Sequence, residues 1–570
     1  MTAREALRRL PGHGVAADLF RRATSASARR TAAILHADLA ETASGLRWVA
    51  GLPPPGEAPV WMMCSMPTVL GLKLEGVMAL IARVAGWRPV AVYADTSPWP
   101  RRYHRQFGIT GEVPYYRYLD ATPTERVRAL EPQGAAYAME ALLDLTYRRV
   151  DVGRIALSNV LYRRKFVRLD LADAATTSEL AAELQAVARR VRAAERMLAA
   201  ERPAFAMVLE KGLSPFAELF GACVAAGVDV VQYSGSQNLN DLVLRRFTYG
   251  NRQDHPFSLD PATWEAVRQA PWSAEDETSV MRMLEDSYRT GSWFKRKYLH
   301  QDKRIEDAAE TRTRLGLTAG RKTAVIFSHV LWDATFFYGR GLFDDYESWL
   351  IETLRAACAN PSLDWVVKLH PDLVWKLKYE GFTGELRDLV AMRTAVGTLP
   401  AHVVIVPPET TLSTYSFFAV ADYCLTVRGT IGIEMACHGV PVLTAGTGRY
   451  SGLGFTVDSA SRAEYLARLA ALQDLPPMDQ ASTTLARRFA KALFQQRPWP
   501  MRTFEVVHGR LDDVGHPLVQ NVAPRVASAR AFASAPEVGS LVAWLRSGSA
   551  DYMHPSGGPA GCAGASGPPQ

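Results

Sequence analysis

Cysteine is scarce in this sequence, and the few cysteines are far apart. Six occur among 570 residues, none of them in a Cys-x-x-Cys pair. Five lie in apolar runs, which is typical of reduced core residues in a cytosolic protein. We therefore expect free, buried cysteines and a cytoplasmic location.

Long apolar runs are also missing. A membrane-spanning helix needs about 20 consecutive apolar residues, and the longest candidate, residues 220–231, is interrupted by Gly227 and Asp229. The first residues, MTAREALRRLPGHG, contain no apolar segment of the kind that a secretory signal requires. These absences predict a soluble protein, with peripheral contact at the inner membrane face left open.

A strong excess of one charge is absent as well. The 65 basic and 58 acidic residues give a net charge of +7, and most arginines lie on helical patterns, so we expect no nucleic-acid partner. Two interpretations stay open where arginines are denser: a solvated helix face, or attraction to anionic lipid headgroups or a polyanionic acceptor. The two denser groups are Arg4, Arg8, Arg9, Arg21, Arg22, Arg29 and Arg30, and then Arg189, Arg190, Arg192 and Arg196.

Length and composition favour two large domains. Hydrophobic residues make up 48% and charged residues 22% of the chain, as in ordinary globular proteins, and the length exceeds what one core holds. The predicted segments are a helical N-terminal extension (1–48), a Rossmann-like acceptor domain (49–260), a helical connector (261–318), a second Rossmann-like domain that binds the nucleotide (319–500), C-terminal helices (501–547) and a disordered tail (548–570).

Short apolar runs alternate with helical patterns in both large segments. In the first segment, residues 60–66 and 89–95 flank a helix-like stretch, and this β-α-β order predicts a parallel sheet. The fold class is therefore α/β, with two doubly wound domains facing a cleft. Because ligands bind at the carboxyl ends of the strands in such sheets, the functional residues should converge there.

The stretch Arg428-Gly429-Thr430 follows an apolar strand and opens a short helix. Unpaired backbone N–H groups at such a helix start suit a phosphate. Thr430 is also placed to cap the helix, and Glu434, one turn further on, could accept hydrogen bonds from ribose hydroxyls. The alternative is an ordinary strand–turn–helix.

A second candidate for nucleotide binding is Lys368-Leu369-His370-Pro371, at the end of a predicted strand. Lys368 and His370 are two residues apart and so share one face of the strand, while the proline ends the ladder. This pair could contact a nucleotide phosphate. The alternative is a strand-end histidine satisfied by the backbone.

Three residues at strand ends are candidates for catalysis. Glu210 ends a strand of the first domain, where its carboxylate could act as a general base, and Asp95 is its competitor at another strand end. For both, a structural or helix-capping carboxylate is the alternative. His329 lies near the end of the first strand of the second domain, from which its side chain could reach the cleft.

The second half of the chain, residues 320–460, resembles bacterial capsule and surface-polysaccharide biosynthesis proteins, GT-B glycosyltransferases that include Kdo transferases. The motifs that carry the resemblance, in order, are LFDDYESWL (342–350), VKLHP (367–371), RGTIGIE (428–434) and GVPV (439–442). The resemblance implies that His370 contacts the nucleotide phosphate, that Gly429 and Thr430 assist, and that Glu434 lies near the ribose. It also implies a CMP-sugar donor as the first choice and no bound cofactor or metal; there is no Asp-x-Asp triplet to chelate one.

The expected protein is thus a GT-B glycosyltransferase that moves a sugar from a nucleotide sugar to a glycan or glycolipid acceptor during capsule or surface-polysaccharide assembly. Two alternatives stay open. One is a nucleotide-sugar epimerase or hydrolase, or a CDP-polyol phosphotransferase, on the same fold. The other is a non-catalytic glycan-binding component of an assembly complex.

Overall fold

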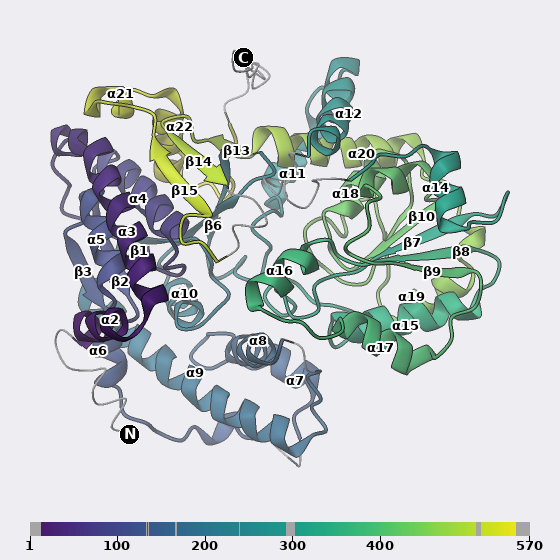
Figure 1. The fold of residues 1–570 in the computed structure, drawn as a ribbon, viewed down its shortest axis with the longest axis horizontal. Coiled ribbons are helices and arrows are strands. Elements are labelled where there is room, and N and C mark those ends of the chain that lie inside the picture. The colour runs from purple at the N-terminus through teal and green to yellow at the C-terminus, as the bar shows by residue number, and fades with distance from the viewer. Residues whose placement is uncertain are drawn as a thin grey trace.

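The chain forms two α/β bodies, each built around its own sheet (Figure 1). The computed structural model describes residues 13–132, 134, 136–165, 168–238, 240–291, 303–508 and 515–554. Helices cover both faces of each sheet, and the predicted fold class, two doubly wound domains, is confirmed.

The first sheet has the strand order β13-β6-β5-β4-β1-β2-β3. Its five strands from β5 to β3 are parallel, while β6 and β13 are antiparallel additions at one edge. The strands are β1 (Pro59–Met63), β2 (Arg88–Tyr93), β3 (Gly111–Pro114), β4 (Phe205–Val208), β5 (Val230–Gly235), β6 (Asp241–Phe247) and β13 (Pro498–Pro500). The helices of this domain are α2 (His13–Thr24), α3 (Ala26–Gly45), α4 (Val69–Val84), α5 (Pro98–Gln106), α6 (Tyr115–Asp120), α7 (Met139–Asp144), α8 (Val152–Arg164), α9 (Ala174–Glu201) and α10 (Phe216–Ala225).

The second sheet is parallel throughout, with the order β12-β11-β10-β7-β8-β9. Its apolar strands are buried on both sides, as parallel sheets require. The strands are β7 (Thr323–Phe327), β8 (Asp364–Lys368), β9 (Val403–Val406), β10 (Tyr423–Thr426), β11 (Val442–Thr444) and β12 (Val457–Asp458). The elements around them are α15 (Tyr346–Ala359), α16 (Asp372–Glu380), α17 (Arg387–Val396), η4 (Thr414–Ala419), α18 (Ile431–Cys437) and α19 (Arg462–Ala470).

Helices connect the two domains in the described parts of residues 261–318. These are α11 (Pro261–Gln269), α12 (Ala274–Arg289) and α14 (Ala308–Leu315), and later in the chain α20 (Gln480–Lys491) packs between α11, α12 and α18. Ser273 and Asp276 form a capping box at the start of α12, which satisfies backbone N–H groups that would otherwise lack acceptors.

The chain returns to the first domain after α20, and this part differs from the prediction of helices over 501–547. A hairpin of β14 (Phe504–His508) and β15 (Gln520–Pro524) comes first and packs on α4. Only then follow α21 (Ala529–Ala533) and α22 (Pro536–Ser547). Along strand β14 the residues are buried, exposed, intermediate, exposed and intermediate in turn. Because only one of the five residues is buried, the pattern of apolar residues is too weak to distinguish this strand from a helix.

The predicted disordered tail also differs where the structure describes it. Asp551 is 4% exposed and Tyr552 is 1% exposed. Asp551 Oδ1 lies 3.3 Å from Arg245 Nη1 and 3.2 Å from Arg497 Nη2, and both arginine side chains are fully buried. The tail therefore enters the first domain to neutralise two buried cations; residues 555–570 lie outside the described part of the chain.

The arginine cluster of α9 makes internal contacts. Arg190 bonds to Glu183 and Glu218, Arg192 to Glu125, and the other two arginines to backbone oxygens of residues 119–122. These contacts favour a structural role over the lipid-binding interpretation. Among the described residues, no helix is both long and apolar enough to cross a membrane. Arg4, Arg8 and Arg9 lie outside the described residues.

Candidate functional site

The carboxyl ends of β4 and β7 meet where the two domains touch. Gly212, in the loop after β4, packs against the ring of Phe337, in the loop after β7; a Cβ added to Gly212 would lie 2.3 Å from Phe337 Cε2. Lys211 is buried beside it, and its ammonium group lies 5.5 Å from the ring centroid of Tyr338. These two loops therefore bring the carboxyl-end edges of both sheets together.

A narrow crevice opens beside this contact, with one wall from each domain. The first domain contributes Leu143 and Arg154, from α7 and α8, and the second contributes loop 335–346 and the turn at Val427 and Arg428. Arg154 is 6% exposed, and its Nη1 donates to the carbonyl oxygens of residues 336 and 339 at 3.0 and 2.8 Å. This arginine ties the loop after β7 to the first domain.

Arg428 is the most unusual residue of the crevice. It is 5% exposed, yet its Nε and Nη1 find no hydrogen-bond partner among the described residues. Its guanidinium carbon lies 5.9 Å from the ring centroid of Tyr346. Because a buried cation without a counter-charge is expensive, and because a guanidinium matches phosphate and carboxylate in shape, Arg428 is poised for an anionic ligand.

The turn that carries Arg428 is held by His329. Nε2 of His329 accepts a hydrogen bond from the Val427 N–H at 3.1 Å and lies 3.1 Å from Thr426 Oγ1. The imidazole stacks on the Tyr346 ring at a centroid distance of 4.4 Å. Burial, with nearby His370 and Arg428, holds its pKa well below the usual range. Nε2 of His329 is thus engaged within the protein and holds the turn, and the predicted catalytic role of His329 stays a prediction.

Gly429 and Thr430 are at the strand–helix junction, as predicted. The Gly429 N–H donates to Thr426 Oγ1 at 3.2 Å, and the Gly429 carbonyl accepts from the Tyr450 hydroxyl at 2.6 Å. Thr430 occupies the N-cap position of α18, but within the described structure its side chain makes no capping bond. The Gly429 N–H is therefore already used inside the protein, and the predicted cap is wrong.

Glu434 does not lie where a ribose contact requires. It is 1% exposed, on the inner side of α18, and it accepts a hydrogen bond from the Tyr288 hydroxyl of α12. Packing of the connector over α18 buries this carboxyl. The predicted ribose contact does not fit this arrangement.

Lys368 and His370 have different surroundings although they are two residues apart. Lys368 is 3% exposed, with its Nζ 5.9 Å from the Phe417 ring centroid and bonded to the Leu369 carbonyl. Burial and the charge of Lys303 lower its pKa to about 7. His370 is partly exposed, and its Nδ1 accepts the Asp372 N–H at 3.2 Å. His370 is thus partly exposed, whereas Lys368 lies in the interior.

The two carboxylates proposed as bases also differ. Glu210 Oε1 accepts the Gly212 N–H at 2.8 Å, and burial together with Asp333 raises the pKa of Glu210. Burial and the charge of Glu210 raise the pKa of Tyr338, which lies across the contact between the two domains. Asp95 is exposed and its Oδ1 accepts the Ser97 N–H at 2.8 Å, just before α5. Asp95 therefore fits the alternative of a structural carboxylate, and Glu210 is the carboxylate at the interdomain contact.

Two arginines of this region were not predicted from the sequence as site residues. Arg154 occurs within a helical pattern that carries other basic residues, so nothing in the sequence separates it from a surface arginine. Arg449 follows Gly446 and Gly448, and its Nε donates to His255 Nε2 at 3.2 Å. Its position in the glycine-rich loop after the RGTIGIE motif was the available signal.

Comparison with known proteins yields structural matches only. No family model matches the sequence, and no curated protein matches it. Among solved structures, the chain is similar to the KpsC β-Kdo 2,4-transferase of Thermosulfurimonas dismutans, with 13% identity, a TM-score of 0.32, and 52% of this chain and 81% of that chain covered.

Two further matches have the same general character. The KpsC β-Kdo 2,7-transferase of the same organism shows 15% identity and a TM-score of 0.30, covering 61% of this chain and 89% of its own. The UDP-GlcNAc 2-epimerase of Neisseria meningitidis, bound to UDP-GlcNAc, shows 10% identity and a TM-score of 0.26, covering 76% and 95%. At these values the likeness concerns the fold, and the assignment of function depends on the site itself.

Proposed function

We propose that this protein is a glycosyltransferase that takes a sugar from a nucleotide-sugar donor and adds it to a growing capsule or surface polysaccharide. The observation that carries the proposal is Arg428, a buried guanidinium with unpartnered N–H groups in a crevice between two doubly wound domains. A nucleotide sugar offers the anionic group that such a residue binds. The sequence motifs at the same strand ends add the resemblance to capsule enzymes.

The residues divide into three roles under this proposal. Arg428 offsets the charge of the donor phosphate and of the leaving nucleotide, while His329 fixes the turn that presents it. His370 would contact the nucleotide phosphate, as the motif resemblance implies. Glu210, on the opposite domain, acts as the base that takes the proton of the acceptor hydroxyl, and burial, which raises its pKa, makes it a stronger base than an exposed glutamate.

A CMP-sugar such as CMP-Kdo is the first choice of donor, and this choice comes from the motif resemblance alone. The acceptor is a glycan or glycolipid, held by the first domain. The chemistry requires no bound metal, because Arg428 supplies the positive charge at the leaving group. Contact of the enzyme with the inner membrane face would follow from a lipid-linked acceptor.

The test combines nucleotide binding with product analysis. CMP, UDP, GDP and CDP are screened for their effect on the melting temperature; at about 100 times its Kd a ligand adds about 2.7 kcal/mol of apparent stability. A CMP-selective shift is expected. The product of CMP-Kdo with an oligosaccharide acceptor is then analysed, and formation of free sugar without transfer would favour the epimerase or hydrolase alternative.

A further inference from the structure

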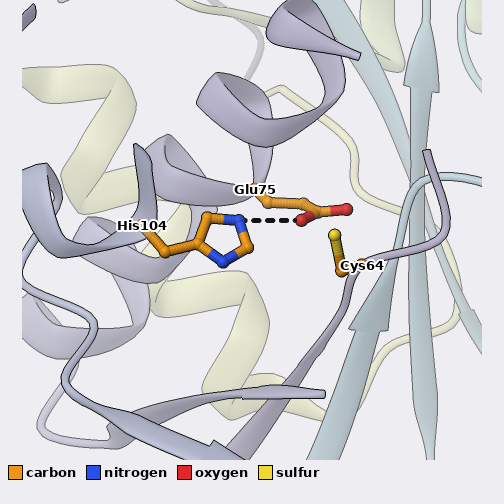
Figure 2. A group of neighbouring side chains, drawn as sticks. All are labelled: Cys64, Glu75 and His104. Carbon is orange, nitrogen blue, oxygen red and sulfur yellow. Dashed lines mark hydrogen bonds and ion pairs between the residues drawn. The ribbon is translucent and has the colours of Figure 1, made fainter. Parts of the chain in front are cut away.

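A second group of reactive side chains lies inside the first domain, apart from the crevice. Cys64 directly follows β1, Glu75 lies in α4 and His104 in α5. They are 7%, 0% and 0% exposed. One sulfur, oxygen or nitrogen atom of each lies within 4.8 Å of the other two, and Figure 2 shows the Cys64 sulfur beside the carboxylate that faces the imidazole.

Cys64, Glu75 and His104 make few hydrogen bonds. His104 Nε2 lies 3.0 Å from Glu75 Oε2, and the other ring nitrogen, Nδ1, lies 2.9 Å from the Tyr93 hydroxyl. Glu75 Oε1 is buried without a hydrogen bond from any described residue, and so is the hydroxyl of Tyr233 on β5. One carboxylate oxygen of Glu75 therefore has no hydrogen bond of ordinary geometry among the described residues, although the Cys64 thiol and the Ser65 N–H lie near the carboxylate.

The charge of this group is not balanced by a permanent cation. In the described part of the chain, His104 is the ion-pair partner recorded for Glu75, with no Lys or Arg beside it. A carboxylate that is fully removed from water needs a counter-charge or a proton. One divalent cation would neutralise a Glu75 carboxylate and a Cys64 thiolate together, leaving a site of zero net charge with a neutral imidazole.

We propose that Cys64, Glu75 and His104 bind one divalent transition-metal ion of the zinc type. Thiolate, imidazole and carboxylate are the three ligand classes that Zn²⁺ takes in proteins, whereas Mg²⁺ and Ca²⁺ take oxygen ligands. Tetrahedral Zn²⁺ at usual bond lengths places its ligand atoms about 3.3 to 3.6 Å apart. Around the ion, the His104–Glu75 pair would open slightly from 3.0 Å, and the group, whose ligand atoms all lie within 4.8 Å of one another, would otherwise close to these spacings.

Binding requires proton shifts that balance the charges. The Cys64 thiol loses its proton to solvent as the sulfur–metal bond forms. The His104 proton moves to Nδ1, so that Nε2 offers its lone pair to the metal and Nδ1–H donates to the Tyr93 oxygen. Tyr93 thereby becomes the outer partner that fixes the ring and its tautomer, an arrangement common to histidine metal ligands.

The ion would fix the loop between β1 and α4. Ser65, next to Cys64, accepts the Glu210 backbone N–H on its hydroxyl at 3.2 Å. Through Ser65 the metal site would steady the loop that carries Glu210, while the ion itself stays outside the crevice and takes no part in sugar transfer. The metal proposal therefore stands or falls independently of the proposed function.

Metal loading of the full chain tests the site. The purified protein is stripped with a chelator, desalted and reloaded with Zn²⁺ or Co²⁺ alone, and metal content is measured by mass spectrometry. We expect one ion per chain, a higher melting temperature, and, with Co²⁺, a thiolate-to-metal charge-transfer band. Substoichiometric metal with no such band would overturn the proposal.

Matched variants assign the ligands. Cys64→Ala should lose the charge-transfer band and most of the bound metal, whereas Cys223→Ala, which changes another buried cysteine of the same domain outside the group, should keep both. Tyr93→Phe removes one hydroxyl and should weaken Zn²⁺ binding about 10- to 100-fold with an unchanged circular dichroism spectrum. Equal metal content and an equal band in wild type and Cys64→Ala would refute the assignment.

Discussion

The Cα of Gly212 lies directly against the ring of Phe337, with no room for a side chain between the two domains. Gly212→Ala would place a methyl group 2.3 Å from Phe337 Cε2, so the ring and its loop must move. We expect sugar transfer to fall at least tenfold, because a displacement of about 1 Å in a catalytic site costs on that scale or more. The measurement is kcat/KM for donor and acceptor.

The control for this change is Gly235→Ala, at the end of β5, where an added Cβ meets no atom within 4 Å in the described structure. It should leave kcat/KM within about twofold. Equal losses in the two variants would mean that the interdomain contact is unimportant for transfer.

Replacement of Arg428 tests the anion site. Arg428→Met removes a buried charge whose Nε and Nη1 lack partners among the described residues, so the free energy of unfolding should rise by about 1 kcal/mol or stay unchanged. Nucleotide affinity should fall by about two orders of magnitude, since a charge-assisted pair is lost. Urea denaturation and calorimetric titration with the bound nucleotide measure the two effects.

Arg355→Met provides the comparison, because Arg355 is 53% exposed and pairs with Glu352 on the same helix. It should change neither quantity measurably. A strongly destabilised Arg428→Met with unchanged nucleotide affinity would assign Arg428 to the structure and not to the ligand.

Replacement of the two candidate bases separates them. Glu210→Gln should lower kcat by a factor of about 10² to 10⁴ with little change in nucleotide binding, whereas Asp95→Asn should reduce stability slightly and leave kcat unchanged. In the wild type, kcat should rise with pH through a value above the usual glutamate range, since the pKa of Glu210 is raised by burial. That rise should disappear in Glu210→Gln, and its persistence would point to another base.

The fold was readable from the sequence where strands are continuous apolar runs, because β7, β8 and β10 are buried on both sides and bounded by loops. Strand β6 was not readable, since it contains Arg245 and Arg246. The buried Arg245 is neutralised by Asp254 and by Asp551, and Asp551 is about three hundred residues away. At the site, the strand ends were located correctly. The burial of Lys368 and Glu434 was not predicted, because the elements that bury these side chains are distant in sequence.

The same long-range pair makes the C-terminal segment essential for stability. Asp551→Asn leaves the fully buried Arg245 and Arg497 without their shared carboxylate, and the free energy of unfolding should fall by about 3 to 5 kcal/mol. Asp286→Asn, which disrupts an exposed pair within α12, should cost less than about 1 kcal/mol. Similar small losses in both variants, measured by urea denaturation, would contradict the role given to Asp551.

Lys368 gives a stability effect with a defined pH dependence. Its pKa falls from 10.5 to about 7 in the folded protein, so between these values the unfolded chain holds a proton that the folded chain lacks. The wild-type free energy of unfolding should therefore rise with pH over this interval, and the full cost of the buried charge is present below pH 7. Lys368→Met removes that cost, so the free energy of unfolding of the variant should exceed that of the wild type by on the order of 3 kcal/mol at about pH 6, and this difference should fade toward about pH 10.

Denaturation curves at both pH values measure this difference. Lys376→Met is the control, because Lys376 is a partly exposed lysine paired with Asp333. An advantage that is equal at the two pH values would show that packing, and not the charge of Lys368, determines the effect.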